Sequence, residues 1–266
     1  MHVEYSHVII GTDGAAPARH ATTVGGAVAA RLALPVVLVT AWKSGLEIPG
    51  AREQSWASMT TKAAEVDLSQ FALARIHRIE AKGDPADVLI DITDQSPRSL
   101  LLVGGRGLGT ATGRLTSSTS NQLSHRSPSD VLFVHNRLHW LESVALATDG
   151  SATSITAARQ GLGLAKAFGA QVILVTANSN AVEGKQVLAN VAEALEPDLA
   201  DTSLTHEVVT GDPATAIPDA AAGTDLLVIG NRGMSGFARM LGSTANSITH
   251  RATSNLLLVN TARISR

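Results

Sequence analysis

The chain has 266 residues, a formal net charge of −2 and no cysteine. The absence of cysteine excludes disulfides, thiol catalysis and cysteine-based zinc sites, and the near-neutral charge argues against binding to nucleic acid or an anionic membrane. Hydrophobic residues make up 44% and aromatic residues only 3%, so Ala, Val, Leu and Ile must build the cores. The length suggests about two domains. Because the N-terminus resembles no signal peptide and no apolar run could span a bilayer, we expect a cytoplasmic protein.

The first half of the sequence alternates β-rich runs with helical patterns. The first run ends in an Asp13-Gly14 turn, and Asp84-Pro85 is a helix start, because Asp can cap a helix and Pro suits its first position. The first β-rich run spans residues 8–14 including this turn, and further strands are predicted at residues 35–41, 75–81, 99–103 and 130–134. The predicted helices lie at residues 15–32, 85–94 and 118–126. A further helix follows a polar segment at 42–58 and runs to about residue 71.

The second half repeats this order of elements. Residues 144–150, 171–177 and 211–214 match residues 8–14, 35–41 and 83–86, and further strands are expected at 226–229 and 255–260 around a helix at 246–251. We therefore predict an α/β fold with two doubly wound, five-stranded parallel sheets and right-handed crossovers. The predicted domains span residues 1–137 and 138–266, and the repeat is too long for a solenoid.

A glycine-rich turn follows the fourth strand of the second half. Gly230 and Gly233 come after the strand, and Gly242-Ser243-Thr244 leads into the next helix. Glycines let the backbone turn through positive φ and let a ligand approach the N–H groups, and the free N–H groups of a helix start attract phosphate. The turn therefore predicts a cradle for a nucleotide triphosphate. The alternative is a tight turn whose glycines only permit the helix to pack on the sheet.

The same turn occurs in the first half, after the fourth strand there. The two turns match closely, except that Ser117 stands where the second half has Gly242. Each half has one arginine between its turn glycines, and this arginine either reaches a phosphate or stays in solvent. The candidate phosphate-binding residues are Gly104, Arg106, Gly107, Ser117 and Ser118 in the first half, and Gly230, Arg232, Gly233, Gly242, Ser243 and Thr244 in the second.

Two further pairs of matched residues end the first and second strands of each half. Asp13 and Asp149 follow the first strands, and Ala41 and Ala177 end the second strands. In an open parallel sheet these ends meet the glycine-rich turn at one crevice. The aspartates could accept hydrogen bonds from a ribose hydroxyl or an adenine amino group, and the alanines could offer backbone groups to the adenine edge. The alternative for each aspartate is a turn-forming Asp-Gly pair.

These features resemble the universal stress protein family in its tandem form, over nearly the whole sequence. The resemblance rests on the Asp after the first strand, on Gly-Asp-Pro-Ala before the third helix, and on G-x-x-G, a spacer and G-[ST] after the fourth strand. It implies a Rossmann-like fold of the adenine nucleotide α-hydrolase type. The nucleotide-binding branch implies ATP, ADP, AMP or cyclic AMP as ligand, with or without Mg²⁺. The family also pairs through its fifth strand, which implies an intrachain pseudo-dimer or a homodimer.

Each half departs once from the family pattern. The usual spacer has nine residues, whereas the second half has eight between Gly233 and Gly242, and the first half has Ser117 in place of the third glycine. A Cβ there would strain a backbone with positive φ and crowd a phosphate, so we expect the first site to be the weaker one.

The predicted function is adenine-nucleotide binding or sensing in a stress response, with output through an unidentified protein partner. The alternative is an interaction scaffold with the same fold that binds no nucleotide. Neither a Gly-Lys-[Ser/Thr] phosphate loop nor a G-x-S-x-G elbow occurs. The resemblance therefore allows slow ATP hydrolysis at most, and no catalytic residue is assigned.

Overall fold

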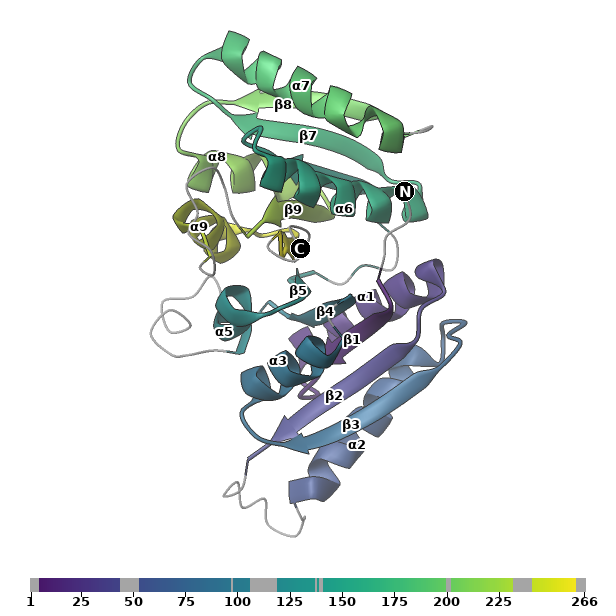
Figure 1. Ribbon diagram of the computed structural model, residues 1–266. Coiled ribbons are helices and arrows are strands. Elements are labelled where there is room, and N and C mark those ends of the chain that lie inside the picture. Colours follow the sequence, from purple (N-terminus) through teal and green to yellow (C-terminus); the bar gives the residue numbers. More distant parts are fainter. Residues whose placement is uncertain are drawn as a thin grey trace. The chain divides into compact units, whose positions relative to one another are not determined.

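The computed structural model describes residues 5–43, 53–96, 98–105, 119–136, 138, 141–199, 202–231 and 241–261. The chain divides into two compact units, here called the N-terminal unit (described residues 5–138) and the C-terminal unit (described residues 141–261). Figure 1 shows helices packed along a sheet in each. The predicted domain boundary between residues 137 and 138 and the predicted pairing of the fifth strands stay predictions.

The N-terminal unit is a five-stranded parallel sheet with strand order β3-β2-β1-β4-β5. Its strands are β1 (His7–Gly11), β2 (Val36–Trp42), β3 (Ile76–Lys82), β4 (Ser99–Gly104) and β5 (Asp130–Val134). Its helices are α1 (Ala16–Leu32), α2 (Glu53–Leu68), α3 (Pro85–Gln95) and α5 (Thr119–Arg126).

The C-terminal unit repeats this topology with strand order β8-β7-β6-β9-β10, again parallel throughout. Its strands are β6 (Ser143–Ala147), β7 (Gln171–Ala177), β8 (Leu204–Val209), β9 (Leu226–Gly230) and β10 (Asn255–Val259). Its helices are α6 (Ala152–Phe168), α7 (Ala181–Leu199), α8 (Pro213–Ala220), a short 3-10 turn at Ala221–Gly223, and α9 (Ser243–Arg251). The predicted tandem of doubly wound five-stranded sheets is confirmed.

The strand order reverses beside β1 in one unit and beside β6 in the other. The chain moves outward from β1 to β3 and then returns to β4 on the opposite side of β1, and the C-terminal unit does the same from β6. In open α/β sheets, ligands bind at the carboxyl ends of the strands beside such a reversal, which are β1 and β4 in one unit and β6 and β9 in the other.

One glycine in each unit lies where a helix packs closely on the sheet. A Cβ on Gly25 of α1 would stand 2.6 Å from Ile10 Cδ1, and a Cβ on Gly161 of α6 would stand 2.5 Å from Leu146 Cδ2. Real Cβ atoms do not approach this closely, so any larger residue would force the neighbouring side chains to shift.

Two helices begin earlier than the sequence predicts. Helix α2 starts at Glu53, inside the predicted polar segment, because Ala57 is fully buried and tertiary packing outweighs the local polarity. Helix α9 starts at Ser243 and not at Asn246, because the Asn246 N–H donates to the Gly242 carbonyl at 2.8 Å and closes an earlier turn.

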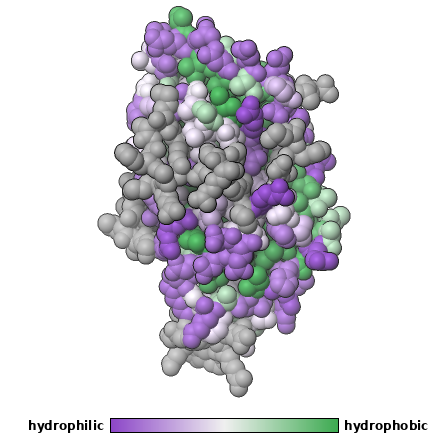
Figure 2. Space-filling model, in the orientation of Figure 1, coloured by the Kyte–Doolittle hydropathy of each residue, from purple (hydrophilic) through white to green (hydrophobic). Residues whose placement is uncertain are grey.

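The face in Figure 2 is dominated by hydrophilic residues, with smaller hydrophobic areas between them. The large apolar side chains that are exposed include Met59 and Val66 on α2 and Val182 on α7. Across the described ranges, no helix combines the length and apolar character needed to cross a membrane.

Candidate functional site

A cavity of about 230 Å³ lies at the carboxyl ends of β1, β2 and β4 in the N-terminal unit. It brings together three of the predicted site residues, Asp13, Ala41 and Gly104, from three neighbouring strands. The lining consists of Gly11, Thr12, Asp13, Ala15, Pro17, Ala18, Val39, Ala41, Pro85, Leu89, Val103, Gly104, Thr119 and Ser120. Among the described lining residues Asp13 is the only charged one, and the others combine small apolar side chains with hydroxyls.

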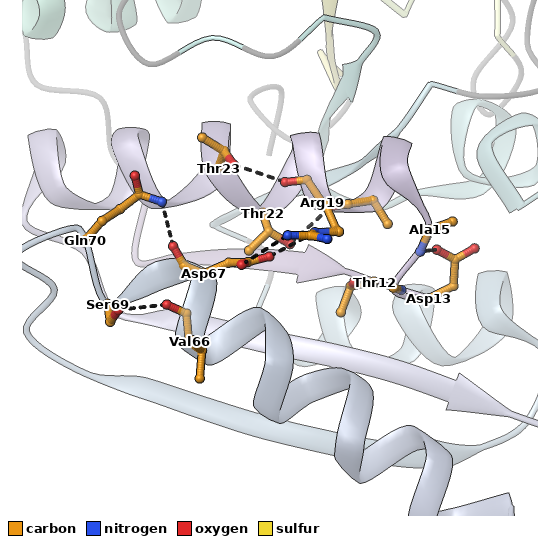
Figure 3. Close-up of polar contacts among 12 residues, drawn as sticks. Thr12, Asp13, Ala15, Arg19, Thr22, Thr23, Val66, Asp67, Ser69 and Gln70 are labelled. Carbon is orange, nitrogen blue, oxygen red and sulfur yellow. Dashed lines mark hydrogen bonds and ion pairs between the residues drawn. The ribbon is translucent and has the colours of Figure 1, made fainter.

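Asp13 shapes the turn between β1 and α1 (Figure 3). The Ala15 N–H donates to Asp13 Oδ1 at 2.9 Å, the Gly14 N–H donates to Thr12 Oγ1 at 3.2 Å, and Gly14 has a φ of 77°. The turn-forming role expected for an Asp-Gly pair is therefore present. The Asp13 side chain is exposed and faces the cavity at the same time, so this role does not prevent contact with a ligand.

The matching turn of the C-terminal unit carries additional hydrogen bonds. Asp149 Oδ1 accepts from the Ser151 N–H at 3.0 Å and from Ser151 Oγ at 2.5 Å. The Gly150 N–H donates to Thr148 Oγ1 at 3.0 Å, and Gly150 has a φ of 80°. Asp149, Ala177 and Gly230 end or directly follow β6, β7 and β9, which are neighbours in the sheet, so these predicted residues also meet at one edge.

Gly104 and Gly105 are required by packing. A Cβ on Gly104 would stand 2.8 Å from Pro17 Cβ and 2.9 Å from the Pro17 carbonyl carbon, and one on Gly105 would stand 2.5 Å from the His135 ring. Burial lowers the pKa of His135, which favours the neutral form of this ring. The packing alternative thus accounts for Gly104, which also lines the cavity.

Gly242 is the N-cap residue of α9 and has a φ of −60° and a ψ of 148°. Its N–H donates to the Asn231 carbonyl at 3.0 Å, and Ser243 and Thr244 are exposed in the first turn of the helix. The expectation of positive φ at this position was wrong, because the chain enters α9 in an extended conformation that any residue adopts. Strain therefore no longer supports a weaker first site, and only crowding by the Ser117 side chain remains as a reason.

The start of α5 supplies cavity residues that the sequence analysis missed. Thr119 and Ser120 line the cavity, and Ser120 Oγ donates to the Gly104 carbonyl at 2.9 Å, which ties the helix start to the end of β4. Thr12 was missed as well, although the triplet Thr-Asp-Gly occurs at the same place in both halves. Six predicted residues lie outside the described residues: Arg106, Gly107, Ser117, Ser118, Arg232 and Gly233.

Asp84 caps α3 beside the cavity, as the sequence predicts. Its Oδ1 accepts from the Ala86 N–H at 3.0 Å, and its Oδ2 lies 2.7 Å from Lys43 Nζ, which follows β2. The hydrogen bond from Lys43 lowers the pKa of Asp84 below its ordinary value, and the Ala86 N–H adds to this effect. Pro85, the next residue, lines the cavity, so this ion pair lies next to the cavity wall.

Replacing Lys43 with methionine is expected to raise the pKa of Asp84 toward its ordinary value. A carboxyl with a lowered folded pKa stabilises the fold above its unfolded pKa, and this stability is lost as pH falls through the folded pKa. Without Lys43 the carboxyl contributes less stability at neutral pH, and its loss on acidification is smaller and complete at a higher pH. The difference stays within about 1 kcal/mol because the pair is solvent-exposed. NMR titration of the Asp84 carboxyl carbon measures the change, with Lys62→Met on α2 as the control. An Asp84 titration unchanged by Lys43→Met would contradict the expectation.

A metal site built by the protein alone is not found in the described ranges. There, no group of three or more His, Cys, Asp or Glu side chains is placed to hold a metal ion.

Comparison with known proteins identifies the family. The model of the universal stress protein family matches residues 4–135 and again residues 141–260. Universal stress protein Rv2005c of Mycobacterium tuberculosis is 23% identical over 279 residues, covering 92% of this chain and 94% of that protein. Universal stress protein Rv1636 of the same organism is 29% identical over 142 residues, covering 49% of this chain and 97% of that protein.

The fold agrees with this assignment. The crystal structure of a universal stress protein from Archaeoglobus fulgidus superposes with a TM-score of 0.73 at 15% identity, covering 97% of both chains. The family model matches each half separately, and each half contains one doubly wound sheet. The chain therefore belongs to the universal stress protein family, as a tandem of two repeats.

Proposed function

We propose that this chain is a stress-response protein that binds an adenine nucleotide in the crevice of one or both units. The observation that carries the proposal is the N-terminal cavity, where an exposed aspartate, the end of β2 and the start of α5 line one space. These are the three kinds of group that a nucleotide needs: an acceptor for hydroxyl or amino groups, an apolar surface for a base, and helix N–H groups for phosphate.

The residues suit the parts of a nucleotide in a definite order. Asp13 lies at the end of β1, between Ala41 at the end of β2 and Gly104 at the end of β4. A base beside Ala41 and phosphates beside the start of α5 would place the ribose next to the Asp13 carboxylate. The cavity of about 230 Å³ is smaller than the roughly 300 Å³ at which sites for whole drug-sized ligands begin. The enclosed part therefore suits a nucleoside, with its phosphates extending outward.

The C-terminal unit supports the same proposal through its helix start. The first-turn N–H groups of an α-helix lack intrahelical partners and carry the positive end of the helix dipole. At α9 this turn bears the exposed hydroxyls of Ser243 and Thr244 directly after Gly242. A phosphate there would receive hydrogen bonds from backbone and side chain together.

The alternative remains an interaction scaffold that binds no nucleotide. It is favoured by one observation: packing against Pro17 and His135 already requires the glycines at 104 and 105, without any ligand. Because packing alone accounts for these two glycines, their presence is compatible with both functions.

Calorimetry with ATP, ADP, AMP and cyclic AMP, each with and without Mg²⁺, tests the proposal. We expect at least one of them to bind with a Kd below about 1 mM, which corresponds to about −4 kcal/mol. Mass spectrometry of small molecules released from the purified protein identifies any ligand retained during purification. If all four nucleotides bind more weakly than about 1 mM, the scaffold function replaces the proposed one.

A further inference from the structure

We propose that the residue two positions after each crevice aspartate, Ala15 or Ser151, sets how strongly that aspartate binds a ligand. The inference rests on the proposed function and assigns the stronger aspartate contact to the N-terminal unit. It concerns one acceptor position on the aspartate carboxylate. The Ser151 hydroxyl occupies this position in the C-terminal unit, and Ala15, which has no hydroxyl, does not occupy it in the N-terminal unit.

In the C-terminal unit, Ser151 directs both of its donors to the aspartate. Its N–H and its Oγ both donate to Asp149 Oδ1, at 3.0 and 2.5 Å, while its Oγ accepts from the Ser154 N–H at 3.2 Å. A carboxylate only accepts and an N–H only donates, so the single hydroxyl proton of Ser151 must go to Asp149. Thr153 Oγ1 lies 3.0 Å from Ser151 Oγ and completes a group of hydroxyls around this oxygen.

In the N-terminal unit the backbone is the same but the hydroxyls are replaced. Ala15 caps α1 with φ −70° and ψ 159°, whereas Ser151 caps α6 with φ −70° and ψ 154°. Asp13 Oδ1 accepts from the Ala15 N–H at 2.9 Å, and Ala15 has no hydroxyl to add. Pro17 and Ala18 stand at the positions of Thr153 and Ser154, so these positions supply no side-chain hydroxyls around Asp13.

The difference changes what each aspartate can offer to a ligand. A donor that already bonds to a carboxylate occupies one of its acceptor positions and stabilises its charge. A ligand hydroxyl or amino group that bonds to Asp149 Oδ1 must share this oxygen with both donors of Ser151, whereas Asp13 Oδ1 already accepts from the Ala15 N–H alone. The same group reaching Asp13 meets an exposed carboxylate on the wall of a cavity. The aspartate contact therefore contributes more to binding in the N-terminal unit.

Reciprocal variants test this inference. Ser151→Ala should strengthen ATP binding in the C-terminal unit, and Ala15→Ser should weaken it in the N-terminal unit, each by about threefold to tenfold, the equivalent of one ordinary hydrogen bond. Titration with ATP, followed through the 15N-labelled amides of Gly14 and Gly150, reads the two units separately. Thr156→Ala is the matched control, because it removes a hydroxyl from α6 that bonds to the Ala152 carbonyl at 2.9 Å and not to Asp149.

Stability separates this role from a merely structural one. Ser151 caps α6, so Ser151→Ala should lower the thermal midpoint while it strengthens binding, and Ala15→Ser should do the opposite. Binding that follows stability in the same direction overturns the inference, and so does binding that neither variant changes. The carboxyl 13C shift of Asp149 in ligand-free protein adds an independent readout, and a shift that Ser151→Ala leaves unchanged also overturns it. If the unmodified protein does not bind ATP, the inference is refuted and ATP is not the ligand. Binding of ADP, AMP or cyclic AMP then decides the proposed function separately.

Discussion

Replacing Gly242 with valine is expected to weaken nucleotide binding in the C-terminal unit by about tenfold to a hundredfold. Gly242 directly precedes the first-turn N–H groups of α9, which we propose bind phosphate. A β-branched side chain there fills the space that a phosphate needs and holds it away from the N–H groups. Each charge-assisted hydrogen bond that is lost costs about 1.5–3 kcal/mol.

The fold should survive this substitution. The φ of −60° and ψ of 148° at Gly242 are accessible to valine, and the two backbone hydrogen bonds, to Asn231 and from Asn246, need no side chain. The measurements are ATP affinity by calorimetry and the thermal midpoint without ligand. Gly223→Val is the control, because a Cβ on Gly223 would meet nothing within 4 Å. Retained binding with a large fall in the midpoint would show that Gly242 serves packing instead.

The second large effect is expected at Gly104, where valine should destabilise the N-terminal unit. A Cβ at this position would stand 2.9 Å from the Pro17 carbonyl carbon, in the backbone of α1, and this backbone cannot turn aside as a flexible side chain can. Overpacking typically costs about 1–3 kcal/mol, and the two methyl groups of valine favour the upper end. At about 2–4 °C per kcal/mol, the thermal midpoint should fall by about 6–12 °C.

Differential scanning calorimetry of ligand-free protein measures this fall. Gly223→Val serves again as the control, since it adds the same side chain where space is open. A midpoint of Gly104→Val equal to that of the control would mean that α1 can shift away from β4, and that packing does not explain the glycine. Gly104→Val is expected to lower the thermal midpoint, and Gly242→Val is expected to lower nucleotide affinity. This difference separates a glycine required by packing from a glycine that lets a ligand approach.

The sequence by itself determined the fold class and the repeat. Alternating β-rich and helical patterns, the Asp-Gly turns after the first strands and Gly-Asp-Pro-Ala before the third helices all recur in both halves. Such signals are local, because they depend on backbone preferences of neighbouring residues and on burial with a fixed period. The same local signals correctly identified Asp84 as a helix cap. They also correctly predicted that Asp13, Ala41 and Gly104 lie at one edge of a sheet.

Only the tertiary structure decided which atoms meet at that edge. The contact between Gly104 and Pro17 and the cavity lining from α3 and α5 depend on elements far apart in the chain. The same holds for the burial of Ala57, which lies inside α2 although the surrounding sequence is polar. Periodicity specifies which face of an element is buried, but the distance between two packed elements depends on side chains from both. The structure also shows which atoms of the two aspartates are engaged: the N–H and the hydroxyl of Ser151 both donate to Asp149 Oδ1, whereas Asp13 Oδ1 accepts from the Ala15 N–H.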